Sequence, residues 1–189
     1  IRKAYLVKEN IGRGSDMSDS DKKIVQAEMQ ALVAYRYTQM FIMYGGVPII
    51  SKSFPLTSLN NLEELAIQRA PIKNVLDSIV SWCDQSAAIL PSRWADNSLG
   101  RMTKSAALAI KAKALLYAAR PLFNKATPYL QLGANNALIC FGNNDPQRWN
   151  VALEASEALI KEAEGAGGLR IINTGNPLAD YGTATSTPS

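Results

Sequence analysis

The sequence predicts an all-α protein in which antiparallel helix pairs are joined by long loops. Apolar residues recur at helical spacing over about four major segments, and no convincing run of alternating apolar and polar residues indicates a β-sheet. The composition is that of an ordinary globular protein, since 47% of the 189 residues are hydrophobic and 19% are charged. A chain of this length can bury a sizeable core.

The first two helices are expected within residues 1–44. Residues 1–11 place apolar side chains on one face, and Ser18 with Asp21 three residues later is typical of a helix start. The long helix that follows carries two apolar stripes, so we expect it to lie between neighbouring helices. Its stripes are Ile24, Ala27, Ala31, Ala34, Tyr35, Phe41 and Ile42, and Val25, Met29, Leu32, Met40 and Met43. Glu28 and Arg36 are predicted to be structural, paired in the core or placed at its edge.

Gly45 and Gly46 are predicted to end the long helix, because they stand where its apolar period stops and match no phosphate-binding pattern. The functional alternative is that they let a ligand approach the backbone. One or two helical turns are expected within 62–68, and Pro71 is placed to begin the next helix. The stripe of that helix is Ile72, Leu76, Ile79, Cys83, Ala87 and Leu90. Trp82 lies off this stripe and is predicted to pack against a neighbouring helix.

The alanine-rich segment 100–124 is the element around which the other helices are expected to pack. Small side chains beside an apolar stripe let helices approach closely, so two helical neighbours are predicted. The stripe is Leu108, Ala112, Leu115, Leu116, Ala119, Leu122 and Phe123. Pro121 disfavours helix at the preceding residue, so the helix is expected to end near Arg120, with Phe123 as a plug in the core.

A long loop is predicted over 124–147, followed by the last clear helix, which starts near Asp145. The apolar face predicted for this helix is Trp149, Ala152, Leu153, Ser156, Ile160 and Ala163. From Asn173 onward the chain is polar and small, and its end is expected to fray.

The connector 92–99 has the local composition that best fits a sugar site. Trp94 stands among Arg93, Asp96 and Asn97. An aromatic face stacks on a pyranose ring, while guanidinium, carboxylate and amide groups bond its hydroxyls. These four residues are the candidate ligand-binding residues. The alternative is that Trp94 folds back onto the helices as a structural side chain.

Several classes of function are disfavoured by composition. The net charge is +4, but the cations are dispersed, so nucleic-acid binding is not expected. The chain has no histidine, and its acidic residues are expected on solvent-exposed faces of helices. We therefore expect no catalytic residues, metal site or cofactor. Cys83 and Cys140 are predicted to be unpaired thiols, and no apolar run reaches the roughly 18 to 20 residues that span a bilayer.

Two stretches in order resemble one family. GRMTKSAALAIKAKALLYAA, residues 100–119, and YRYTQMFIMYGGVPII, residues 35–50, are similar to signatures of the SusD/RagB family, surface glycan-binding lipoproteins of Bacteroidetes. The resemblance implies an α-solenoid related to tetratricopeptide repeats (TPR-like). It also implies that residues 1–172 are a SusD-like helical region of a longer protein, with 173–189 a polar tail or truncated continuation.

The resemblance further implies a non-catalytic nutrient-binding protein on the outer face of the outer membrane. It would capture oligosaccharides for import through a partner SusC-like TonB-dependent transporter, and a lipid anchor outside this chain would hold it to the membrane. Some members of the family take up peptides, so the ligand class stays open. The alternative from another class is an intracellular helical-repeat scaffold that binds protein partners in a groove.

Overall fold

The computed structural model describes residues 1–54 and 62–186, and all regular structure within these ranges is helical. The α-helices are α1 (Arg2–Asn10), α2 (Asp19–Tyr44), α3 (Leu62–Leu65), α4 (Ile72–Ala87), α5 (Lys104–Ala119), α6 (Gln147–Glu164) and α7 (Pro177–Ser186). The short 3-10 helices of the described ranges are η1 (Ile11–Arg13), η3 (Asp96–Ser98) and η4 (Gly133–Leu138). The all-α prediction is confirmed.

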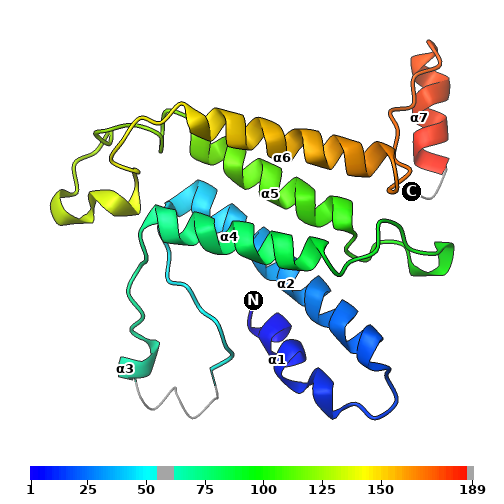
Figure 1. Ribbon diagram of the computed structural model, residues 1–189, viewed down its shortest axis with the longest axis horizontal. Helices are drawn as coiled ribbons and strands as arrows, with labels where there is room; N and C mark the ends of the chain where they lie inside the picture. The colour runs from blue at the N-terminus through cyan, green and yellow to red at the C-terminus, as the bar shows by residue number, and fades with distance from the viewer. Residues whose placement is uncertain (55–61, 187–189) are drawn as a thin grey trace.

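Successive long helices pack as antiparallel neighbours (Figure 1). α1 and α4 both lie against α2, while α5 lies between α4 and α6 and also touches α2. The two helical neighbours expected for the alanine-rich helix are therefore α4 and α6. The result is a stack of helix pairs with long loops, a TPR-like α-solenoid. No helix in the described part of the chain combines the length and apolarity needed to cross a bilayer.

Both ends of α2 follow from the sequence. At its start, the Ser18 hydroxyl accepts a hydrogen bond from the Asp21 backbone N–H at 3.1 Å and donates one to the Asp21 carboxylate at 2.6 Å. This arrangement satisfies one of the free N–H groups of the first turn. At its end, Gly45 adopts φ 73°, a backbone conformation that favours glycine.

Gly46 brings the chain's own backbone close to the end of α2. Its N–H donates to the Leu138 carbonyl at 2.6 Å, and a Cβ added at Gly46 would lie 2.2 Å from the Ala70 carbonyl oxygen. The predicted helix cap is confirmed. The backbone that approaches Gly46 belongs to the protein itself. This contact joins the long loop before α6 to the end of α2.

The stripe predicted for α4 is buried throughout: Ile72, Leu76, Ile79, Cys83 and Ala87 lie on the helix, and Leu90 follows its end. Trp82 packs edge-on against Tyr37 of α2, with ring centroids 4.9 Å apart, so its predicted packing role is confirmed. Cys83 and Cys140 are both buried and unpaired. Burial raises the pKa of the Cys83 thiol to about 12, which keeps it an unreactive core residue.

α5 ends at Ala119 as predicted, and Arg120 is extended. Its buried side is made mostly of small residues: Ser105, Ala107, Ile110, Ala112, Ala114, Leu115, Ala118 and Ala119. The predicted stripe is wrong at Leu116 and Leu122, which are exposed. The alanines form the contacts with α4 and α6, because small side chains allow close approach on two sides.

Phe123 is buried and lies against Phe41 of α2, with ring centroids 4.8 Å apart. The prediction that this aromatic plugs the core is confirmed. The contact joins the segment after α5 to α2.

The apolar face predicted for α6 is wrong at its largest residues. Trp149, Leu153 and Ile160 are 46%, 57% and 53% exposed, whereas Ala152 and Ala155 are buried. Among the described helices, α6 packs against α5 alone. Only the side of α6 that carries Ala152 and Ala155 is therefore covered by another helix. On α2, the predicted stripe residues Leu32, Tyr35 and Met43 are likewise exposed.

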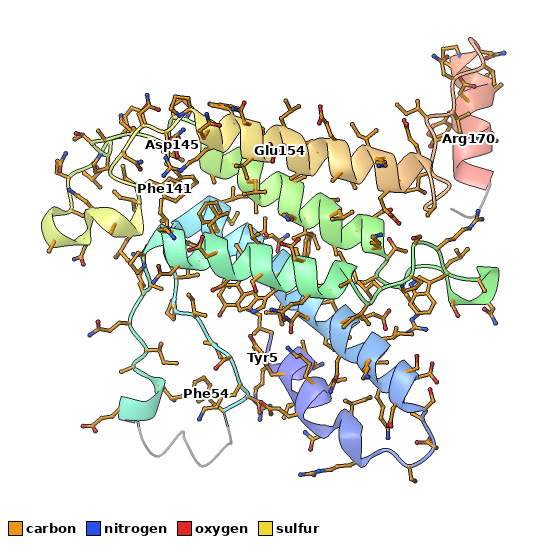
Figure 2. The ribbon with its side chains drawn as sticks, viewed as in Figure 1. Tyr5, Phe54, Phe141, Asp145, Glu154 and Arg170 are labelled. Carbon is orange, nitrogen blue, oxygen red and sulfur yellow. The ribbon has the colours of Figure 1, made fainter. Side chains whose placement is uncertain are left out.

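The long loop before α6 is closed at its base by one buried amide. The Asn124 side chain donates to the Asp145 carbonyl at 2.9 Å and accepts from the Asp145 N–H at 2.8 Å and from Arg148 at 2.6 Å. The Arg148 guanidinium also lies over the Phe141 ring, 4.2 Å from its centroid. Figure 2 shows Phe141 and Asp145 together at this end of α6.

The tail 173–189, expected to be polar and to fray, contains α7, which stands beyond the C-terminal end of α6 (Figure 1). Residues 187–189 lie outside the described residues. The domain boundary at residue 172 stays a prediction.

Candidate functional site

The predicted ligand-binding residues lie between α4 and α5. From here on, the connector means this whole segment, residues 88–103. Its two ends meet, because the Lys104 N–H donates to the Pro91 carbonyl at 2.9 Å. Between them the chain passes through η3 and turns at Gly100, which has φ 86°. The connector is therefore a closed loop that projects from one end of the helical stack (Figure 1).

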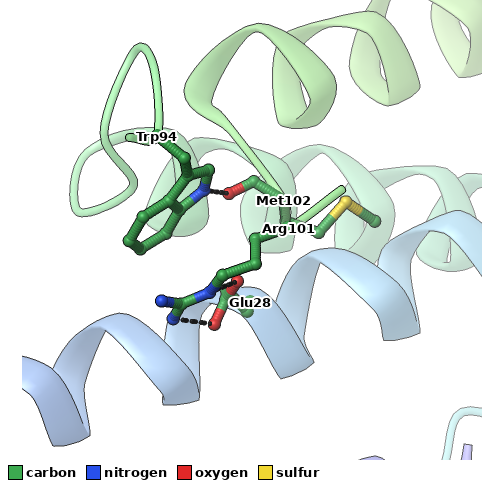
Figure 3. A network of polar contacts seen from close by, with 4 residues as sticks. All are labelled: Glu28, Trp94, Arg101 and Met102. Carbon is green, nitrogen blue, oxygen red and sulfur yellow. Dashed lines mark hydrogen bonds and ion pairs between the residues drawn. The ribbon is translucent and has the colours of Figure 1, made fainter. Parts of the chain in front are cut away.

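Trp94 is half-buried and held in a fixed orientation. Its indole N–H donates to the Met102 carbonyl at 2.8 Å, and the Arg101 guanidinium carbon lies 3.7 Å from the ring centroid (Figure 3). A guanidinium over an aromatic face is a favourable cation–π contact. The indole donor and one face of the ring are thus occupied within the protein.

Arg101 in turn ties the connector to α2. Its Nε and Nη2 donate to the two carboxylate oxygens of Glu28 at 3.0 and 2.7 Å (Figure 3). The Glu28 side chain is 10% exposed and that of Arg101 is 38% exposed. Two parallel hydrogen bonds hold this pair in one geometry. The predicted structural role of Glu28 fits this pairing, whereas Arg36 is exposed and donates to its helical neighbour Gln39.

The other predicted site residues lie on the same loop. Arg93 is exposed and its guanidinium lies beside Gly168, and Asn97 is exposed and accepts a hydrogen bond from Ser98. Asp96 begins η3, but its side chain lies outside what the structure describes. Among the described residues no hydrogen bond joins Arg93 or Asn97 to Trp94. The structure thus brings the candidates onto one loop without a direct network between them.

Sequence reasoning missed Arg101, the residue that organises the connector. The available signal was indirect: Glu28 interrupts an apolar helix face and, as a charged residue on a buried side, needs a cation. The sequence does not say which cation it takes, since Arg101 lies 73 residues further along the chain.

Glu162 of α6 binds both the connector and the start of α5. Glu162 accepts a hydrogen bond from the Ser92 hydroxyl at 2.5 Å and pairs with Lys104 at 2.9 Å. The hydrogen bond from Ser92, together with that from Lys104, lowers the pKa of the Glu162 carboxyl below its ordinary value. The connector is therefore anchored on both sides, to α2 through Arg101 and to α6 through Ser92.

Glu162→Gln is expected to lower the free energy of unfolding at pH 7 by about 1 kcal/mol, because it removes charge-assisted hydrogen bonds. Since the pKa of Glu162 is lowered in the folded state, its stabilisation is complete above the unfolded value of about 4.3 and is lost as the pH falls through the folded value. Urea unfolding of wild type and variant at pH 7 and pH 3 measures both differences. Glu157→Gln, at an exposed position of the same helix, is the control, and equal losses for both variants at pH 7 would refute the prediction.

The described side chains provide no group of three or more His, Cys, Asp or Glu residues arranged to hold a metal ion. What the connector offers chemically is an oriented indole together with exposed guanidinium and amide donors. The fold and this braced loop define an all-helical protein with a TPR-like arrangement of helices.

A sequence model of the SusD-like family, described as starch-binding and associating with the outer membrane, matches residues 1–116. Because this match covers more than half of the 189 residues, the chain belongs to the SusD-like family. No curated protein matches the sequence.

Solved structures agree with the family. The chain is similar to BT4246, with 29% identity and a TM-score of 0.77 over 90% of this chain and 30% of that one. It is also similar to a SusD-like protein, BF3747, from Bacteroides fragilis NCTC 9343, with 22% identity and a TM-score of 0.68 over 96% of this chain and 28% of that one. A laminarin-binding SusD-like protein matches 63% of this chain and 24% of its own, at 24% identity and a TM-score of 0.55. The chain thus spans 30% or less of the length of these proteins.

Proposed function

We propose that this chain is the helical part of a non-catalytic surface protein that captures oligosaccharides. The family match over residues 1–116 carries the proposal. A relative in fold is named for binding laminarin, which supports a glycan as the ligand. Two acids next to the connector have structural partners, because Glu28 pairs with Arg101 and Glu162 pairs with Lys104.

The connector is the proposed ligand contact, through Arg93, Trp94, Asp96 and Asn97. Trp94 is partly exposed and its ring is held by Met102 and Arg101, as an aromatic platform for a pyranose ring requires. The exposed guanidinium of Arg93 and the amide of Asn97 supply hydrogen-bonding groups for hydroxyls on the same loop.

A glycan array followed by calorimetry with the full-length protein tests this function. We expect oligosaccharide binding that weakens at least tenfold in Trp94→Ala, a loss typical of an aromatic contact in a binding site. Trp149→Ala is the matched control, because Trp149 is an exposed tryptophan on α6, away from the connector. Circular dichroism of each variant checks that it remains folded.

Two outcomes separate the parts of the proposal. Clear peptide binding without any carbohydrate binding would remove the glycan function. Carbohydrate binding that is equally strong in Trp94→Ala and wild type would remove the connector as the contact and leave the function in place.

The partner and location are proposed from the family. The protein would lie on the outer face of the outer membrane, held by a lipid anchor outside this chain, and would pass its ligand to a SusC-like TonB-dependent transporter. The family description as associating with the outer membrane supports this. A reading frame for a TonB-dependent receptor beside this one, and co-purification of the two proteins, are the expected results; an isolated gene whose product purifies alone would contradict the partnership.

A further inference from the structure

A groove of about 270 Å³ lies between α1, α2 and α4. Its polar lining comes from all three helices and consists of Lys8, Lys23, Gln26, Gln30, Gln85 and Ser86. The volume is close to the lower end, about 300 Å³, of small-ligand sites, so the groove has room for roughly one sugar unit. It lies at the end of α4 that leads into the connector, but shares no lining residue with the connector.

Most of the groove's surface is apolar, with Ala27 and Ile89 in its lining, and two lysines and three glutamines are set into it without any carboxylate. Gln30 donates to Gln85 at 2.7 Å, and Gln85 donates to Ser81 at 2.9 Å, so the amides are oriented in a chain from α2 to α4. The Ser86 hydroxyl is buried and has no hydrogen-bond partner among the described residues. Two lysines in a lining without acids favour a ligand that carries acceptors and negative charge.

Lys8 is the central cation of this groove. It is half-buried, donates to the Gln30 side-chain oxygen, and makes no ion pair with the acids that the structure describes. Removal from solvent lowers the pKa of Lys8, since burial disfavours its charged form. Lys23 is exposed at the rim and also makes no ion pair in the described residues. An anion between them would compensate both charges.

A smaller compartment of about 70 Å³ adjoins the groove and shares Lys8 and Gln30 with it. This compartment is lined by Tyr5, labelled in Figure 2, and by Ser51 and Trp82. Trp82 is half-buried and packed against Tyr37, so an aromatic group of fixed orientation lines this compartment beside the groove. Aromatic surface beside amide and hydroxyl donors is the combination that recognises a pyranose ring.

We propose that this groove binds an acidic unit of an oligosaccharide, a uronic acid or a sulfated sugar. Lys8 and Lys23 contact its carboxylate or sulfate, and Gln26, Gln30 and Gln85 bond its hydroxyls. This inference rests on the proposed function of glycan capture and names the class of glycan.

Calorimetry with tetragalacturonate and with the neutral galactotetraose tests the inference on the full-length protein. Wild type is expected to bind the acidic tetrasaccharide at least tenfold more tightly than the neutral one. Lys8→Gln/Lys23→Gln is expected to weaken tetragalacturonate about tenfold or more and to leave galactotetraose unchanged, since it removes two charge-assisted contacts. Lys113→Gln, an exposed lysine of α5 outside the groove, is expected to behave as wild type.

The outcomes distinguish this inference from the function on which it rests. Equal binding of the two tetrasaccharides, or no loss in the double variant, would overturn the acidic-sugar site and leave glycan capture intact. Tighter binding of tetraglutamate than of tetragalacturonate would overturn the sugar class. Absence of all glycan binding would overturn the proposed function itself. Should the double variant fail to fold, Lys23→Gln alone, at an exposed position, is expected to weaken tetragalacturonate about threefold.

Discussion

Phe41→Ala is expected to lower the free energy of unfolding by about 3–5 kcal/mol, the range for truncation of a buried phenylalanine. Phe41 is fully buried in α2 and its ring packs on Phe123, 4.8 Å away between centroids. The truncation leaves a cavity between α2 and the segment after α5, and Phe123 loses its aromatic neighbour. Urea unfolding followed by circular dichroism at pH 7 measures the change.

Met43→Ala is the control for this substitution. Met43 lies two residues further along α2 and is 76% exposed, so its truncation is expected to cost no more than about 0.5 kcal/mol. A similar small loss for Phe41→Ala would mean that the core is not centred on the contact between α2 and Phe123.

The helices and their ends could be predicted from local chemistry. Ser18 and Gly45 mark the ends of α2 through hydrogen bonding and backbone conformation within a few residues, and Pro121 stops α5 in the same local way. The face of α4 was also predictable, because this helix packs on both α2 and α5 and buries its full apolar stripe.

The buried faces of α5 and α6 could not be predicted from the apolar period alone. On α6 the large residues Trp149 and Leu153 are exposed, while the small Ala152 and Ala155 are buried. The period shows where apolar side chains lie on a helix, but the number of neighbours decides which of them are covered. A helix packed on one side covers only part of its apolar surface.

The candidate site shows the same division between local and long-range information. Trp94 was identified from its neighbours in sequence, and the connector does hold it with Arg93 and Asn97 on one loop. Its bracing depends on the pairing of Arg101 with Glu28, 73 residues apart, and on that of Ser92 with Glu162. Such pairs depend on how the helices stack, which a single sequence does not specify.

Arg101→Met is expected to lower the free energy of unfolding by about 2 kcal/mol. Removing one partner of a buried ion pair costs about 3–5 kcal/mol, and the smaller value applies here because the Arg101 side chain is 38% exposed. The loss has two parts: the Glu28 carboxylate, whose side chain is 10% exposed in the intact protein, loses its cation, and the Trp94 ring loses the guanidinium on its face. Urea unfolding measures the loss, and Arg36→Met, at an exposed arginine of α2, is expected to cost no more than about 0.5 kcal/mol.

A double-mutant cycle with Glu28→Gln separates these two parts. If the ion pair provides most of the stabilisation, Arg101→Met costs much less in the Glu28→Gln background, and the coupling energy is about 1–2 kcal/mol. The cost of Arg101→Met that remains in the Glu28→Gln background measures the contact with Trp94, and Trp94→Phe should reduce this remaining cost. A coupling energy near zero would show that Arg101 acts on the connector without Glu28. Since the proposed glycan contact requires a fixed Trp94, Arg101→Met is also expected to weaken oligosaccharide binding, although no contact between Arg101 and the ligand is invoked.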